Sequence, residues 1–375
     1  MLNDTKTEFK SQARELHDYR NGKERPWREK KEQNTVYADV LTVLEVQDST
    51  LLMSEASRES ILLYPEAPRD SEESLLLKEE VLEALGTLAV FSSKKVARVS
   101  QCADVLRFAV TDTGHLKLKQ TWFCKSRLCP MCSWRRSIKY AVDVSKIVEE
   151  AVKREPNGRW LFLTLTTKNT TNADDLSNEI KRYSVALRKM LRSKALKDMV
   201  LGFSRGIEVT VNKEDGTYNQ HMHVLLFVKS TYFVRGNYLK KAKWVSLWRE
   251  AMDLDYDPSV DVRAVEDADS DKRFKAVLEV AKYPVKSTDY LLGDDEESFD
   301  NNLKIVKDLE QALYRKRLTA FGGLLKTIQK ELNIKDIDSD KADLIATGEE
   351  VEQEAETGQE ISARWDSWNK KYYID

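Results

Sequence analysis

Hydrophobic and polar residues alternate along parts of this chain with the period of a β-strand. In residues 99–123 apolar residues recur at every second position on both sides of Asp112–Gly114, a pattern that predicts a β-hairpin. A second hairpin is predicted around Asn212–Thr217, which contains the turn-forming pair Asp215-Gly216. Further along, the strand pattern predicts β-strands at residues 160–167, 203–211, 220–228 and 260–264.

Other segments have apolar residues with the period of an α-helix. Helices are predicted at residues 133–154, 178–198, 238–252, 272–283 and 302–332, with a further leucine-rich amphipathic helix at residues 75–88. Helices and strands therefore alternate, but short hairpin turns favour an antiparallel sheet over a doubly wound parallel one. The predicted fold class is α+β, with a sheet flanked by helices.

The chain divides into five regions by composition and pattern. They are a polar and helical N-terminal region at 1–98, a cysteine-rich module with a basic helix at 99–155, a central sheet unit at 156–300, a helical region at 301–335, and an acidic, partly disordered tail at 336–375.

Charge is distributed unevenly, although the formal net charge is only −2. Between Lys94 and Glu250 there are 31 basic and 14 acidic residues. This excess indicates either a polyanionic partner such as nucleic acid or a solvated basic exterior, and charge alone leaves both open. No apolar run reaches the ~18 residues of a membrane helix, and the polar N-terminus lacks a signal-peptide core. We therefore expect a cytoplasmic protein without a membrane partner.

Two of the four histidines, His221 and His223, lie two positions apart in a predicted strand. Residues at i and i+2 point to the same face of a sheet, so both imidazoles project together. A four-residue hairpin loop places Glu208 opposite His221, whereas a two-residue loop places Glu208 opposite His223, and both registers keep Glu208 on the histidine face. The three residues are candidate ligands of a catalytic divalent cation. Two exposed histidines without a metal are the alternative.

A second candidate for chemistry is the helix that ends near Tyr283. Glu279 and Tyr283 are one helical turn apart, Pro284 sets the tyrosine near the helix end, and Lys286 follows three positions later. A tyrosine oxygen needs activation to act as a nucleophile, and a nearby lysine can stabilise the phenolate. An ordinary Glu–Tyr pair on an amphipathic helix is the alternative interpretation.

Three of the four cysteines, Cys124, Cys129 and Cys132, fall within nine residues, and Cys102 lies across the predicted hairpin from them. An intracellular cluster of this kind indicates a structural Zn²⁺ rather than disulfides. His115 is a reserve fourth ligand, and reduced cysteines without a metal are the alternative. Four basic residues around the cluster are candidate contacts to DNA phosphates: Lys125, Arg127, Arg135 and Arg136.

The three segments Phe162–Thr167, His221–His223 and Glu279–Tyr283 appear in the order of the three motifs of HUH endonucleases. The cysteine-rich segment Phe123–Ser137 resembles a signature of the replication initiators of small rolling-circle plasmids of Gram-positive bacteria. The resemblance covers about residues 99–330, with weaker similarity at Arg25–Lys31. One departure is an insertion at about residues 41–90 between the two N-terminal similarities.

The resemblance implies an HUH endonuclease-like core at 156–300, with a five-stranded antiparallel sheet and the histidine strand at its centre. Tyr283 would cut one strand at the plasmid double-strand origin, single-stranded at the nick site, with Mg²⁺ or Mn²⁺ as cofactor. The cut would leave a 5′-phosphotyrosine and a 3′-OH primer, and Glu279 would activate water at termination. Implied partners are the host helicase, single-strand-binding protein and DNA polymerase, with a homodimer also possible.

Two rival functions remain at this point. A single-tyrosine transposase or conjugative relaxase would share the nuclease core, although the cysteine signature favours a plasmid initiator. A non-catalytic zinc-ribbon DNA-binding regulator would account for the basic middle of the chain and the cysteines. It would leave the two histidines, Glu279 and Tyr283 without a role.

Overall fold

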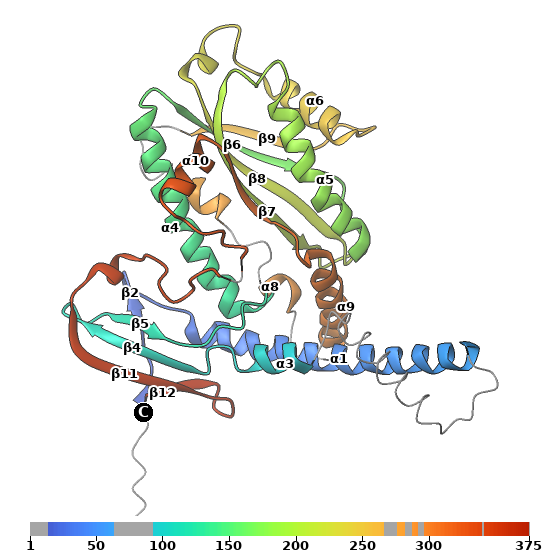
Figure 1. The fold of residues 1–375 in the computed structure, drawn as a ribbon, viewed down its shortest axis with the longest axis vertical. Helices are drawn as coiled ribbons and strands as arrows, with labels where there is room; N and C mark the ends of the chain where they lie inside the picture. Colours follow the sequence, from blue (N-terminus) through green and yellow to red (C-terminus); the bar gives the residue numbers. More distant parts are fainter. Residues whose placement is uncertain are drawn as a thin grey trace, which may run out of the picture.

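A computed structural model describes residues 14–63, 93–265, 276–281, 287–291, 296–339 and 341–374 of the chain (Figure 1). Two five-stranded sheets organise it, and helices pack on both faces of the one that carries the two histidines. Within these ranges no helix combines the length and the apolar character that a membrane span requires.

The histidine-bearing sheet has the strand order β10-β7-β8-β6-β9, and every pair of neighbours is antiparallel. The strands are β6 (Arg159–Thr166), β7 (Val200–Val211), β8 (Tyr218–Val228), β9 (Val260–Val265) and β10 (Thr319–Gly323). The predicted α+β class with an antiparallel sheet is confirmed. Strand β8, which carries His221 and His223, is the central strand of the five.

Strand β10 corrects the prediction of one long helix at residues 302–332. The chain instead forms helix α9 (Glu296–Leu313), then β10, then helix α10 (Leu324–Glu331). A methyl group added at Gly322 would come within 2.1 Å of the Phe203 ring on β7, so glycine is needed where these strands pair. Pairing with a strand more than a hundred residues away outweighs the local helical pattern.

Helices cover the two faces of this sheet in pairs (Figure 1). Helices α5 (Ala173–Leu191) and α6 (Lys241–Met252) pack on one face, where Tyr183 of α5 donates a hydrogen bond to the Gln220 carbonyl. Helices α4 (Pro130–Arg154) and α10 lie on the other face, where the Tyr140 hydroxyl is 3.1 Å from the Ser204 hydroxyl. That second face also carries Glu208, because residues 204 and 208 are an even number of positions apart on β7.

The second sheet is built around the predicted hairpin of residues 99–123, which the structure confirms as β4 (Val105–Thr111) and β5 (Leu116–Gln120). Its order is β1-β12-β11-β4-β5, and the added strands come from the two ends of the chain. They are β1 (Arg14–Glu15), β11 (Glu356–Asp366) and β12 (Lys371–Ile374). A short pair, β2 (Tyr19–Arg20) and β3 (Lys23–Glu24), lies beside them.

The segment after residue 335, predicted to be an acidic and partly disordered tail, contains strands β11 and β12. Residues 341–374 are described, and β11 pairs with β4 while β12 pairs with β11. Part of the physical reason is charge, since Glu356 lies 2.9 Å from the Lys117 ammonium and 3.0 Å from that of Lys119 on the hairpin. The acidic composition therefore complements a basic strand instead of preventing folding.

The remaining helices are α1 (Trp27–Leu63), α3 (Ser93–Ser100) and α8 (Ser287–Tyr290). Helices α1 and α3 pack against each other, whereas α8 contacts α9 and strand β7. Helix α1 begins against the cysteine module and runs on into the expected insertion at 41–90 (Figure 1). The leucine-rich helix predicted at 75–88 lies outside the described residues.

Candidate functional site

Glu208, His221 and His223 meet at one point on the face of the histidine-bearing sheet. Glu208 pairs directly with His221, which is the register of the longer predicted hairpin loop. One Glu208 carboxylate oxygen lies 3.2 Å from Nε2 of His221 and 3.0 Å from Nε2 of His223. The three side chains therefore share one face, as predicted, and the tertiary structure selects one of the two predicted registers.

The ring of His223 is held in place from the neighbouring strand β6. The Thr164 hydroxyl lies 3.2 Å from Nδ1 of His223, and the Phe162 ring stacks on the imidazole with centroids 5.5 Å apart. These contacts leave Nε2 directed toward Glu208. Neither Thr164 nor Phe162 was predicted individually as a site residue. The two lie two positions apart in the segment Phe162–Thr167, and Thr164 pairs with His223, so both face the same side as the histidines.

The donor set fits a small divalent cation. One ligand atom from each of the three residues lies within 4.8 Å of the others, and the three side chains are largely buried. Burial opposes ionisation of Glu208, but hydrogen bonds from both histidines outweigh it and hold the pKa of the carboxyl well below its ordinary value. A carboxylate and two imidazoles on a rigid sheet could therefore hold a metal ion.

The helical residues 276–280 contact the sheet on the same face as this triad. Gly206 pairs with His223 and lies two positions before Glu208, so it faces the same way. A methyl group added at Gly206 would stand 2.6 Å from the Val280 carbonyl oxygen. The backbone of the segment that carries Glu279 therefore packs directly on the strand that carries Glu208. Gly206 was not predicted as a site residue from the sequence.

Tyr283 and Lys286 lie outside the described residues, but the chain is described on both sides of them. After them, Ser287 donates a 2.6 Å hydrogen bond to the Gln33 side chain of α1. The Tyr290 hydroxyl donates to the carbonyl of Leu128, the residue before Cys129. The segment is thus attached to the sheet at residue 280 and to the cysteine module at residue 290.

All four cysteines come together in one buried cluster, with no disulfide among them. Sγ of Cys132 lies 3.6 Å from Sγ of both Cys102 and Cys124, and Sγ of Cys129 lies 3.6 Å from Sγ of Cys102. Four thiolates around a tetrahedral Zn²⁺ with bonds of about 2.3 Å would lie about 3.8 Å apart. The cluster therefore has the size of a zinc site. The reserve ligand His115 lies elsewhere, against Glu354 at the hairpin turn.

A family model for a replication protein matches residues 115–374. The chain belongs to this replication protein family. A "Protein rep" of Lactiplantibacillus plantarum is 39% identical over 360 residues, covering 94% of this chain and 96% of that protein. A "Protein rep" of Bacillus amyloliquefaciens is 44% identical over 300 residues, covering 76% and 86%. A "Replication protein" of Staphylococcus aureus is 42% identical over 240 residues, covering 63% and 99%. No solved structure is significantly similar.

In this replication protein, two of the four expected DNA contacts are structural. Arg135 is buried and donates to the Leu344 and Ile345 carbonyls of the C-terminal segment. Arg136 is buried and donates to the Ser126 and Lys125 carbonyls of the cysteine loop. Both guanidinium groups are enclosed by protein atoms. The prediction that these two side chains contact DNA phosphates is therefore wrong.

Arg136 instead supports the cysteine cluster electrostatically. Burial opposes ionisation of Cys132, but hydrogen bonds from the other three cysteines and the charge of Arg136 outweigh it and hold the pKa of this thiol well below its ordinary value. Lys125 and Arg127 are half-buried, and Arg127 lies 3.7 Å from Asp338. A DNA contact by these two residues stays a prediction.

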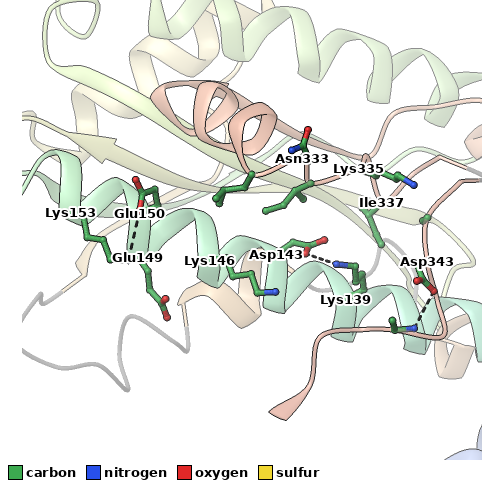
Figure 2. A pocket seen from close by; sticks show the side chains of 14 residues that line it. Lys139, Asp143, Lys146, Glu149, Glu150, Lys153, Asn333, Lys335, Ile337 and Asp343 are labelled. Atoms are coloured by element: carbon green, nitrogen blue, oxygen red, sulfur yellow. Dashed lines mark hydrogen bonds and ion pairs between the residues drawn. The ribbon is translucent and has the colours of Figure 1, made fainter. Parts of the chain in front are cut away.

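The replication protein also has a cavity of about 510 Å³ between α4 and residues 332–346 (Figure 2). Its lining contains four basic and four acidic side chains, and Lys139 pairs with Asp143 at 2.6 Å. Neither the Glu208–His221–His223 triad nor a cysteine lines it. The balanced charges match a packing gap beside the C-terminal segment, and we assign no ligand to it.

Proposed function

We propose that this protein initiates rolling-circle replication of a plasmid by cutting one strand of the double-strand origin with Tyr283. The observation that carries the proposal is the position of residues 276–280 against Gly206, on the sheet face of Glu208, His221 and His223. Tyr283 follows Val280 by three residues in the sequence. In this proposal the antiparallel sheet is the HUH-like nuclease core at residues 156–300, completed by β10 from the C-terminal region.

The proposed reaction is a phosphodiester exchange. The Tyr283 oxygen attacks the scissile phosphorus, the bond to the 3′ oxygen breaks, and that oxygen takes up a proton to become a free 3′-OH. A Mg²⁺ or Mn²⁺ ion held by the triad would supply a Lewis acid for the scissile phosphate. Lys286, three residues after the nucleophile, is proposed to stabilise the phenolate. The 3′-OH then primes the host polymerase, with host helicase and single-strand-binding protein as further proposed partners.

Adduct formation tests this function directly. Purified protein is incubated with labelled supercoiled plasmid and Mn²⁺, and denaturing gels are used to detect labelled DNA joined to protein. A covalent adduct and a nicked circle are expected. A non-catalytic DNA-binding regulator would give neither, and that result would reject the proposal.

Glu279 is proposed to act only when water must be activated at termination. Its side chain is partly exposed, and it precedes Tyr283 by four residues in the sequence. Loss of a general base slows its step by ~10²–10⁴-fold. Glu279→Ala should therefore nick at nearly the normal rate but fail to terminate, leaving over-long strands on a plasmid with two origins. Glu297→Ala, an exposed substitution on α9, is the control. If Glu279→Ala impairs nicking and termination equally, or impairs neither, the proposal that Glu279 acts only at termination is contradicted.

The cysteine cluster is proposed to hold one structural Zn²⁺. Metal analysis of chelator-washed protein should find about one zinc per chain, distinct from the exchangeable nuclease metal. Among single substitutions, those that remove a structural metal cause some of the largest losses of stability. Cys129→Ser should therefore lower the free energy of unfolding by about 4 kcal/mol or more. Nicking by the fraction that stays folded should change less than stability does. Zinc-free protein with unchanged melting behaviour would disprove the site.

A further inference from the structure

We infer that the connection between β8 and α6 binds the unpaired DNA strand beside the nick, an inference that rests on the proposed function. Together with the neighbouring connection between α5 and β7, it forms what we call the distal basic patch. The patch consists of the basic side chains of two chain segments: Arg192, Lys194 and Lys197 in the first, and Lys229, Arg235, Lys240, Lys241 and Lys243 in the second.

The charge of the patch is nearly uncompensated. Residues 229–243 contain five basic residues and no acidic one, and all five basic side chains are exposed. None of them forms an ion pair with another part of the chain that the structure describes. The connection at 192–200 lies alongside, since the Lys229 amide donates a 2.9 Å hydrogen bond to the Met199 carbonyl. Asp198 is the one acidic residue there, so a polyanion is the matching partner.

Exposed aromatic rings distinguish this patch from an ordinary solvated basic face. Tyr238 is 55% exposed and Phe233 is 39% exposed, and their ring centroids lie 6.3 Å apart. Both rings pack on the buried Tyr232, whose hydroxyl accepts a 3.3 Å hydrogen bond from the Trp244 indole of α6. Fixed aromatic rings among lysines are typical of surfaces that bind single strands by phosphate contact and base stacking.

The position of the patch relates it to the nick site. Strand β8 carries His223 and leads without interruption through Val228 to Lys229. Six residues of extended chain span about 20 Å. A DNA strand cut at the metal triad would therefore reach the patch, at the far end of β8, several nucleotides from the scissile phosphate. There the patch could hold the DNA without contacting the reacting atoms.

The charge contribution is tested with the double variant Lys241→Ala/Lys243→Ala. Binding of a fluorescent single strand of about 30 nucleotides centred on the nick is measured by anisotropy at several salt concentrations, without metal. Loss of two phosphate contacts should reduce the slope of log affinity against log salt by about 1.4. Lys23→Ala/Lys341→Ala, which removes two exposed charges outside the patch, should leave the slope unchanged.

The stacking contribution is tested with Tyr238→Ala. Loss of one base–aromatic stack should weaken binding of the single strand about tenfold or more, while a duplex of the same sequence binds normally. Tyr238→Phe keeps the ring and should bind like the wild type. Equal losses for single strand and duplex would overturn the assignment to unpaired DNA.

Two outcomes separate this inference from the proposed function. An unchanged salt slope in the double variant would overturn the inference and indicate another occupant, such as an acidic protein surface, even if the wild type forms its adduct. Conversely, a reduced slope with no adduct from the wild type would support the patch and reject the nicking reaction. Because binding is measured without metal, neither result depends on cleavage.

Discussion

Tyr283→Phe is expected to abolish both strand nicking and the covalent adduct, with a loss on the order of 10⁴-fold or more. The substitution removes only the nucleophilic oxygen, so the helix contact at Gly206 and the Tyr290 contact with Leu128 should persist. Origin binding, which we propose uses the basic surfaces, should therefore stay near the wild-type level. Nicking rate and adduct yield on supercoiled origin plasmid are measured together with origin affinity.

The matched control is Tyr314→Phe, which removes the hydroxyl of an exposed tyrosine in the turn after α9. It should nick and form the adduct normally. Digestion of the wild-type adduct should recover the DNA on a peptide that contains residue 283. Recovery on another tyrosine, or an adduct formed by Tyr283→Phe, would show that the nucleophile has been assigned to the wrong residue.

His223→Ala is expected to reduce nicking more than about 10²-fold. Loss of a residue that only orients a metal ligand typically reduces activity by up to about 10²-fold, and loss of a ligand itself should have a larger effect. Its Nε2 lies 3.0 Å from the Glu208 carboxylate, and its ring is positioned by Thr164 and Phe162. Affinity for Mn²⁺, measured by calorimetric titration, should fall in parallel. The melting temperature should change less than the nicking rate, since the substitution removes a polar side chain that contacts Glu208 and Thr164 and removes no apolar core side chain.

His17→Ala provides the comparison, since His17 is an exposed histidine paired with Glu24 in the short β2–β3 region. It should retain normal Mn²⁺ affinity and nicking. If His223→Ala nicks at the wild-type rate with metal present, the triad is not the catalytic site. Loss of nicking with unchanged Mn²⁺ affinity would instead place the metal elsewhere.

The candidate metal site could be predicted from the sequence because it depends on a local rule. Alternation along a strand puts His221 and His223 on one face in any fold, and the hairpin brings Glu208 to that face in either register. The cysteine cluster was predicted equally well, because three of its members are close in sequence and a hairpin brings the fourth opposite to them. Which register forms, and how Thr164 orients His223, depends on the pairing of β6 with β8.

The basic residues show where sequence reasoning was insufficient. Arg135 and Arg136 stand in a basic helix and were expected to contact DNA, yet the partners that bury Arg135 are carbonyls 209 and 210 residues away. Local composition cannot indicate whether a charged side chain will meet solvent or a distant backbone group. The distal basic patch was missed for the opposite reason, because its lysines lie on two connections that only the fold places side by side.

The sequence by itself determined the α+β fold class, the shared face of Glu208, His221 and His223, and the cysteine cluster, because each follows from short-range periodicity and spacing. Only the tertiary structure decided that residues 319–323 form a strand and that the acidic C-terminal segment joins the β4–β5 hairpin. It also decided that the helix before Tyr283 rests on Gly206. Pairing between strands far apart in the sequence depends on which sheet edge is free and which charges meet at that edge. Neither can be predicted from the residues that neighbour each strand in the sequence.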